Sequence, residues 1–146
     1  MIKFFYLVDF SYLVSKDYTS HFDLGIFSTK KKAEEKIKMS VDLPGFNEHG
    51  IENFNIMKFG VHFDTIPKNK SEVTLYCVYH EYERGKYSYY TIFDYFSSQE
   101  KAEAKVQYLK KHSRLGRKYP NNFEIVDLNV DNYLSWSEGF DKLPLE

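Results

Sequence analysis

The feature that most constrains the fold of this chain is a phrase that occurs twice. Residues 26–37 read IFSTKKKAEEKI, and residues 95–106 read YFSSQEKAEAKV, so that Phe27 aligns with Phe96 at an offset of 69. Each copy runs from aromatic, strand-like residues into a Lys- and Glu-rich segment with helical spacing. The sequence therefore predicts the same joint between a strand and a helix at two places.

The alignment continues on both sides of this joint. Upstream, Tyr6 corresponds to Tyr76 at an offset of 70, and downstream NFNIMKFGV (53–61) matches NFEIVDLNV (122–130) at 69 again. Matches that stay in register across several elements indicate an internal repeat. We predict two copies of one unit, at residues 3–64 and 73–134. A linker at residues 65–72 joins the copies, and a tail at residues 135–146 follows the second copy.

Each copy predicts the order strand, turn, strand, helix, strand. Apolar residues occupy every second position of the first strand, which is typical of a packed face: Phe4, Tyr6, Val8, Phe10, Tyr12 and Val14. One apolar stripe runs along each helix: Ala33, Ile37 and Val41, then Ala102, Val106 and Leu109. Ser28 and Ser97 are the predicted helix N-caps, and Ser97 with Glu100 has the spacing of a capping box.

A crossover through the helix makes the second and third strands parallel and places the first strand between them, in the order 2-1-3. One copy of about 70 residues buries little apolar surface by itself. We therefore expect the copies to pack about a pseudo-two-fold axis, like a fused homodimer. The predicted fold class is α+β: two tandem ββαβ repeats with a mainly antiparallel sheet and helices on one face, in a single compact domain of residues 1–146.

Composition excludes several classes of protein. Twenty basic residues face 21 acidic ones, so no net charge draws the chain to nucleic acid or to anionic lipid. Cys77 is the single cysteine, which excludes an internal disulfide and favours a reducing compartment. The apolar N-terminus is interrupted by Asp9, and no run reaches the roughly 18–20 apolar residues of a membrane span. A cytoplasmic protein with no membrane partner is predicted.

No motif in the sequence predicts catalysis. It has no Gly-rich phosphate loop and no G-x-S-x-G elbow, and its five histidines show no H-x-x-x-H spacing. A single cysteine cannot build a thiolate zinc site. We therefore predict no enzyme, no catalytic residues, no cofactor and no metal site.

The most polar stretch of a predicted strand is HEYER at residues 80–84. His80 and Tyr82 share one face of that strand, where they can form a hydrogen-bonding or acid–base pair. The alternative is that His80 replaces its aligned partner Phe10 at the rim of the sheet, with glutamates facing water. We favour the alternative.

A basic stretch, KKHSRLGRK at residues 110–118, offers a possible phosphate site through Lys110, Lys111, Arg114 and Arg117. The alternative is a solvated helix end, where cations complement the helix dipole and Gly116 ends the helix or its following turn. The second interpretation is favoured.

Aromatic residues give the strongest functional signal. Among 13 tyrosines, seven fall between residues 76 and 95, on both faces of one predicted hairpin. A half-buried hairpin needs rings on one face only, so another molecule, the first copy or an identical chain covers the second face. The predicted partner-binding residues are His80, Tyr82, Tyr87, Tyr89, Tyr90 and Trp136. Trp136 is either a binding anchor or, with Phe140, part of a tail that covers the core.

Several short motifs carry a resemblance to a known family. They are YHEYE (79–83), WSEGF (136–140), PGF (44–46) and the repeated strand-to-helix joint. With these motifs the chain resembles a family of short bacterial proteins built on a domain of unknown function with a strand-strand-helix-strand unit. The resemblance implies a type of fold and supplies no catalytic residue.

These observations favour a non-enzymatic interaction protein whose partner is another protein, such as an immunity, antitoxin or phage counter-defence protein. A homodimer is also compatible with the sequence, whereas nucleic acid is not a favoured partner. The alternative is a small-ligand or nucleotide-binding module with a pocket at the repeat interface that uses Arg114 and Arg117.

Overall fold

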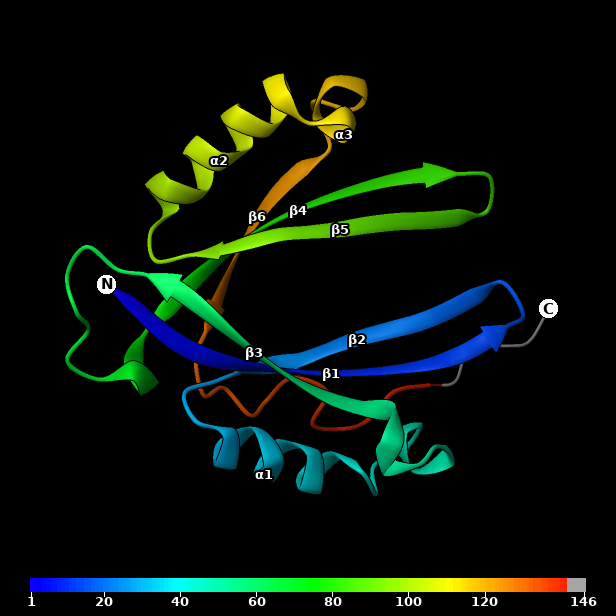
Figure 1. Ribbon diagram of the computed structural model, residues 1–146. Coiled ribbons are helices and arrows are strands. Elements are labelled where there is room, and N and C mark those ends of the chain that lie inside the picture. Colours follow the sequence, from blue (N-terminus) through cyan, green and yellow to red (C-terminus); the bar gives the residue numbers. More distant parts are fainter. Residues whose placement is uncertain (142–146) are drawn as a thin grey trace. The chain divides into compact units, whose positions relative to one another are not determined.

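The computed structural model describes residues 1–141 and has an α+β fold (Figure 1). The strands are β1 (Ile2–Ser15), β2 (Tyr18–Phe27), β3 (Phe54–His62), β4 (Thr74–Arg84), β5 (Tyr87–Phe96) and β6 (Phe123–Asn129). The α-helices are α1 (Lys30–Ser40), α2 (Gln99–His112) and α3 (Arg114–Lys118), and short 3-10 turns cover Phe46–Glu48, Ile51–Asn53 and Lys70–Glu72. Among the described residues, no helix is both long and apolar enough to span a bilayer.

The strands form two separate three-stranded sheets, in the orders β2-β1-β3 and β5-β4-β6. Both hairpins, β1–β2 and β4–β5, are antiparallel. The expected strand order, with the first strand of each set in the middle, is confirmed. The short helix α3 was not predicted from the sequence.

Both hairpins carry an irregularity at the same place. The β1–β2 register shifts between Val8 and Asp9, where Leu24 is the extra residue on β2. The β4–β5 register shifts between Val78 and Tyr79, where Phe93 is the extra residue on β5. A bulge of this kind increases the local twist and turns side chains toward a new direction.

The chain forms two compact units, and each unit combines segments from both halves of the chain. The β1–β3 unit comprises residues 2–60, 67–73 and, of the described residues, 129–141; this last segment begins before the tail predicted at 135–146 and is called the tail below. The β4–β6 unit comprises residues 74–128, 61–66 and Met1. The predicted linker, 65–72, is therefore divided between the units.

In the β1–β3 unit the core lies between the sheet and α1. Val8, Phe10 and Tyr12 are buried on the α1 side of β1, as the alternation predicts, and Ala33 is buried on α1. Phe140, from the tail, completes this core. The predicted helix stripe is confirmed, since Ile37 and Val41 pack against the same cluster.

In the β4–β6 unit the core is smaller. Val78 packs against the buried helix residues Ala102, Val106 and Leu109, so the stripe predicted for α2 is also confirmed. The opposite face of the sheet is buried too, at Leu75 and Cys77. Figure 1 shows α2 lying along β4 and β5.

Both predicted helix N-caps are wrong by one residue. The cap of α1 is Thr29, whose hydroxyl accepts from Lys32 N at 3.2 Å, and the cap of α2 is Ser98, which accepts from Lys101 N at 3.2 Å. The capping box of Ser97 with Glu100 is therefore absent. Repeated Ser and Thr residues before a helix make its exact start ambiguous in the sequence, because each can act as a cap.

Ser28 has a different role, because it holds the tail. The carboxylate of Asp131 accepts from the Ser28 backbone N–H at 2.8 Å and from its hydroxyl at 2.6 Å. It also accepts from Lys32 Nζ at 3.0 Å. Asp131 has a left-handed backbone with φ of 60°, which Asp tolerates better than most residues. This network fixes the tail to the start of α1.

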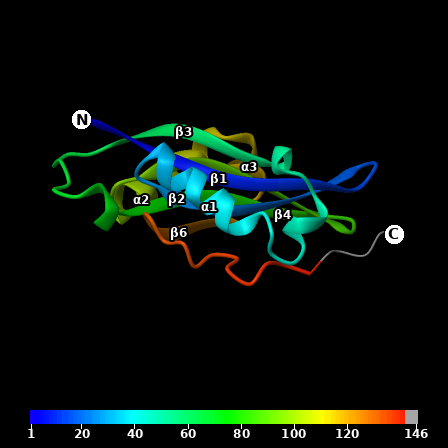
Figure 2. The same ribbon diagram turned by 90° about the horizontal axis from the view of Figure 1, so that it is seen from below.

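The tail then follows α1 toward its C-terminus (Figure 2). The buried Lys36 donates from Nζ to the carbonyl oxygens of Tyr133 at 2.9 Å and Ser135 at 2.5 Å. Phe140 N donates to Pro44 O at 2.8 Å beyond the helix. Burial lowers the pKa of Lys36, and these two carbonyls satisfy its buried ammonium group.

We expect Asp131→Asn to lower the free energy of unfolding by about 1.5–3 kcal/mol, because the substitution removes a buried charge that accepts several hydrogen bonds. Asp64→Asn is the matched control. Asp64 also pairs with a lysine, Lys101 at 3.1 Å, but its side chain is 76% exposed, so its loss should cost under about 1 kcal/mol. Urea denaturation at neutral pH measures both, and equal losses would contradict the assignment.

The stability difference between the parent and Asp131→Asn should depend on pH. Burial raises the pKa of Asp131, but hydrogen bonds from Ser28, Ser71 and Lys32 outweigh it and leave this pKa below 3.8. A lowered carboxyl pKa adds stability above the unfolded value, and that stability is lost as pH falls through the folded pKa. The parent and Asp131→Asn should therefore approach equal stability below about pH 4.

Separated halves of the chain should not fold alone. A fragment that ends in the 65–72 segment lacks Phe140, and a fragment of residues 73–146 lacks Val61 and Phe63, all of which are buried. We expect each fragment to be unfolded, or to fold only with the other half, in circular dichroism and size-exclusion measurements. A monomeric, cooperatively folded 73–146 fragment would show that this expectation is wrong.

Candidate functional site

The tip of hairpin β4–β5 exposes tyrosine rings. Tyr89 is 45% exposed and Tyr90 is 47% exposed, and they are neighbours on β5, so their side chains leave opposite faces of the strand. Tyr87 is half-buried at the start of the same strand. Rings on both faces agree with the expectation for this hairpin, whereas their role as a binding surface stays a prediction.

Three tyrosines form a stack across this end of the β4–β6 unit. Tyr82 lies between Tyr89 and Tyr119, with ring centroids 5.4 Å and 5.0 Å apart and planes within 22° and 11°. Tyr82 and Tyr89 are cross-strand partners, and Tyr119 follows α3. The stack gives the surface rigid aromatic rings that lose little conformational entropy when another molecule covers them.

His80 lies beneath this stack. The imidazole is fully buried, so the expectation of a rim position is wrong: Tyr119 covers it, and Phe123 meets it edge-on at 4.7 Å. His80 Nε2 lies 2.9 Å from the carbonyl oxygen of Tyr119, which makes Nε2 the protonated nitrogen. Nδ1 is buried without a hydrogen-bond partner among the described residues. His80 thus supports the site from below and does not reach a partner directly.

A hollow of about 510 Å³ opens beside the stack. It is lined by residues of β4 and of the segment that leads into β6: Glu81, Tyr82, Glu83, Asn121, Asn122, Phe123 and Glu124. Asn122 holds the two sides together. Its side-chain Nδ2 donates to the backbone oxygen of Glu81 at 2.9 Å, and its backbone carbonyl oxygen accepts from Glu81 N at 3.2 Å. Three glutamates make the hollow acidic and suited to cationic groups.

Tyr79 and Glu124 form a hydrogen bond at the edge of this hollow. The Tyr79 hydroxyl donates to a Glu124 carboxylate oxygen at 2.6 Å. This bond, together with burial, raises the pKa of Tyr79 to about 12. The hydroxyl therefore stays protonated at neutral pH and acts as a donor.

Trp136 packs on hairpin β1–β2, within the β1–β3 unit. Its ring lies 4.5 Å from that of Phe22 on β2, and Phe140 lies 4.6 Å from the same ring. Of the two interpretations of Trp136, the structure supports the tail that covers the core. The Trp136 side chain keeps 38% of its surface exposed, so a contact with a partner stays a prediction.

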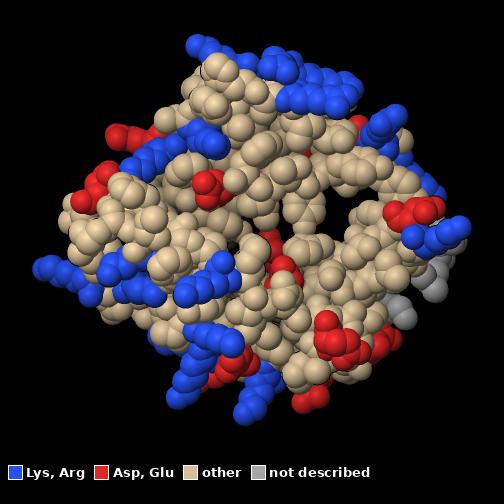
Figure 3. All heavy atoms as spheres, in the orientation of Figure 1, with Lys and Arg blue, Asp and Glu red and all other residues tan. Residues whose placement is uncertain are grey.

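The basic stretch is an exposed helix end. Lys110 and Lys111 lie in the last turn of α2. Arg114 and Arg117 lie on α3, whose N-cap is Ser113. Figure 3 shows Lys and Arg side chains gathered over these helices. Gly116 was expected to end the helix or its following turn, but it lies inside α3, where an added Cβ would clash with Leu109 O. A phosphate site at these residues stays a prediction.

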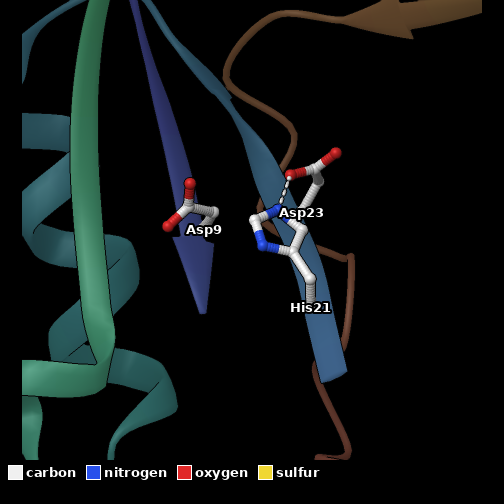
Figure 4. Close-up of side chains that lie close together, drawn as sticks. All are labelled: Asp9, His21 and Asp23. Atoms are coloured by element: carbon white, nitrogen blue, oxygen red, sulfur yellow. Dashed lines mark hydrogen bonds and ion pairs between the residues drawn. The ribbon is translucent and has the colours of Figure 1, made fainter. Parts of the chain in front are cut away.

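Sequence reasoning missed one group of polar side chains. Asp9 on β1 and His21 and Asp23 on β2 bring one oxygen or nitrogen atom each to within 4.8 Å of one another (Figure 4). His21 Nε2 and Asp23 Oδ1 are 3.0 Å apart. His-x-Asp on a strand places both residues on one face, and that spacing is the signal that was available in the sequence.

The group is electrostatically coupled. The hydrogen bond with Asp23 raises the pKa of His21, against the effect of partial burial. Burial raises the pKa of Asp9, which the nearby His21 opposes and Asp23 reinforces. Asp9 and Asp23 are direct cross-strand partners, an arrangement that like charges disfavour.

A second hollow, of about 660 Å³, lies between α1 and β3. Its floor is apolar, with Ile37, Val41, Phe54 and Ile56, and Lys31 and Lys38 stand among the charged residues at its rim. Its size is that of a small-molecule pocket.

The chain matched no protein-family model, no curated protein and no solved structure in the three comparisons made.

Glu124→Gln should return the Tyr79 pKa from about 12 toward its usual value of 10.0, because the neutral amide no longer stabilises the protonated phenol. The titration of the Tyr79 ring carbon that bears the hydroxyl, followed by NMR, measures this pKa directly. Glu83→Gln, an exposed carboxylate on the same strand, is the control and should leave it unchanged. An unshifted value in Glu124→Gln would contradict the contact.

Proposed function

We propose that the protein is a non-enzymatic interaction protein that binds another protein through hairpin β4–β5. The observation that supports this most strongly is the pair of exposed rings, Tyr89 and Tyr90, on opposite faces of one strand. Tyrosine combines a large apolar ring with a hydrogen-bonding tip and is enriched at protein interfaces. No catalytic motif occurs in the sequence to support an enzyme.

We further propose that the chain consists of two ββαβ repeats related by a pseudo-two-fold axis. The equivalent strand orders and the bulges at Leu24 and Phe93, which are 69 positions apart, support a duplication. Equivalent lysines also support it. Lys32 meets Asp131 at 3.0 Å and Lys101 meets Asp64 at 3.1 Å, so a carboxylate that follows a third strand lies near the start of a helix in both units.

The duplication provides an internal comparison for the proposed site. Tyr12 aligns with Tyr82, and in the β1–β3 unit the ring of Tyr12 is 4% exposed beneath Phe140, 5.6 Å away, and His49, 4.5 Å away. In the β4–β6 unit Tyr89 and Tyr119 flank Tyr82 and leave it half-buried. The position covered by the tail in one unit is thus available to a partner in the other.

The character of the surface indicates the chemistry of the partner. Stacked tyrosines favour an aromatic or guanidinium group, and the acidic hollow formed by Glu81, Glu83 and Glu124 favours a positive charge. We infer a partner protein that presents arginine or lysine beside an aromatic residue. Bacterial immunity, antitoxin and phage counter-defence proteins are classes in which such a binding role fits a chain of this size, and a cytoplasmic location would suit it.

Two alternatives remain as proposals. A homodimer would cover the same tyrosines with a second copy of the chain. A small-ligand module is supported by the hollow between α1 and β3, which differs from the expected site because it lies within the β1–β3 unit and does not use Arg114 or Arg117.

The double variant Tyr89→Ser with Tyr90→Ser should weaken partner binding at least tenfold, because exposed aromatic anchors supply a large part of interface energy. The partner is first captured with tagged protein from the native host, and its affinity is then measured by calorimetry. Tyr108→Ser is the matched control: this ring is 55% exposed on α2, so its loss should leave the affinity unchanged.

Circular dichroism should show that all these variants remain folded. Normal binding by the double variant, with binding lost in His21→Ala or Phe22→Ala, would place the site on the β1–β2 hairpin and contradict the proposal. Sedimentation of the isolated parent and of the isolated double variant tests the homodimer alternative. Only that alternative predicts that the parent has the mass of a dimer and the double variant that of a monomer.

A further inference from the structure

We propose that Asp9, His21 and Asp23 form a binding site for Zn²⁺ on hairpin β1–β2. The inference is independent of the proposed protein-binding surface, because all three residues lie in the β1–β3 unit. It adds a metal site where the sequence predicted none.

Local strand geometry creates the site. Side chains alternate along a strand, and Phe22 and Leu24 belong to the core cluster on the α1 side, so His21 and Asp23 lie on the opposite face. The bulge between Val8 and Asp9 pairs Asp9 with Asp23. Figure 4 shows the Asp9 carboxylate on one strand beside the His21–Asp23 pair on the other.

The charges of the group favour a divalent cation. Two carboxylates at directly opposed positions repel each other, and a protonated His21 would compensate only one of them. Asp9 is half-buried and Asp23 is exposed, so water screens this repulsion only in part. A divalent ion between the two strands compensates both charges and leaves the imidazole neutral.

The donor atoms select zinc among common ions. Imidazole nitrogen and carboxylate oxygen are zinc ligands at about 2.0–2.2 Å, whereas Mg²⁺ and Ca²⁺ prefer oxygen donors alone. Ligands in a tetrahedral zinc site lie roughly 3.3 Å apart. The separation of His21 Nε2 and Asp23 Oδ1, 3.0 Å, is already near this value, and a modest rotation of Asp9 brings in the third donor from within 4.8 Å.

Three protein ligands leave the fourth tetrahedral position open. An open position is typical of sites that hold water or accept a donor from another molecule, and closed four-ligand sites are typical of structural zinc. The Asp9–His21–Asp23 site thus fits reversible zinc binding better than a structural role. We expect the protein to fold without the metal.

Other parts of the chain provide contrasts. The positions of hairpin β4–β5 that align with the three donors hold Tyr79, Tyr90 and Ile92, which offer no equivalent set. His62 lies 3.9 Å from Asp64, but Lys101 Nζ lies 3.4 Å from the same imidazole and would repel a cation. His62 is therefore a matched control histidine, close to one carboxylate and far less suited to zinc.

Calorimetric titration of the full chain with Zn²⁺ tests the proposal. We expect one ion per chain, no heat of binding with Mg²⁺ at the same concentration, and a selective shift of the His21 imidazole signals in NMR spectra. His21→Ala and Asp23→Asn should each weaken zinc binding at least tenfold, whereas His62→Ala should bind as the parent does.

Urea denaturation without metal checks that the variants remain folded. Asp9→Asn removes the third ligand and should also weaken zinc binding. Absence of saturable binding at millimolar Zn²⁺ would overturn the site. The same conclusion would follow if His62→Ala lost binding while His21→Ala kept it, or if Mg²⁺ bound more tightly than Zn²⁺.

Discussion

The buried carboxylate of Asp131 organises much of the β1–β3 unit. It accepts from Ser28 N and Oγ and from Lys32 Nζ, and these bonds hold a segment from the far end of the chain against the start of α1. The described residues that follow Asp131 run along α1 from that attachment. The carbonyls that satisfy Lys36 and the ring of Phe140 come into place because the tail leaves Asp131 in a fixed direction.

The tail also explains why the two hairpins differ at their surfaces. In the β1–β3 unit Phe140 fills the space over Phe10 and Phe22, and a deep aromatic core results. In the β4–β6 unit the aligned positions hold His80 and Thr91, and tyrosines stack there with part of their surface in water. The proposed binding surface is thus the part of the proposed second repeat that the described tail does not cover in the way that Phe140 covers Tyr12.

The candidate sites were predictable from the sequence to different degrees. The sequence showed rings on both faces of hairpin β4–β5 but did not say which face would be covered, and the structure leaves both Tyr89 and Tyr90 exposed. His80 was misplaced, since a histidine on a polar stretch gives no sign that Tyr119, far along the chain, will cover it. The spacing of His21 and Asp23 was visible in the sequence, but Asp9 joins them only when β1 and β2 pair with a bulge.

By itself the sequence determined the local elements: the alternation of β1, the apolar stripes of α1 and α2, and the order of strands in each sheet. Those features depend on residue periodicity and on the handedness of short connections, which nearby residues specify. Only the tertiary structure decided that Asp131 binds Ser28 and which rings are covered. The physical reason is that such contacts join residues up to 103 positions apart, so that no local pattern encodes them.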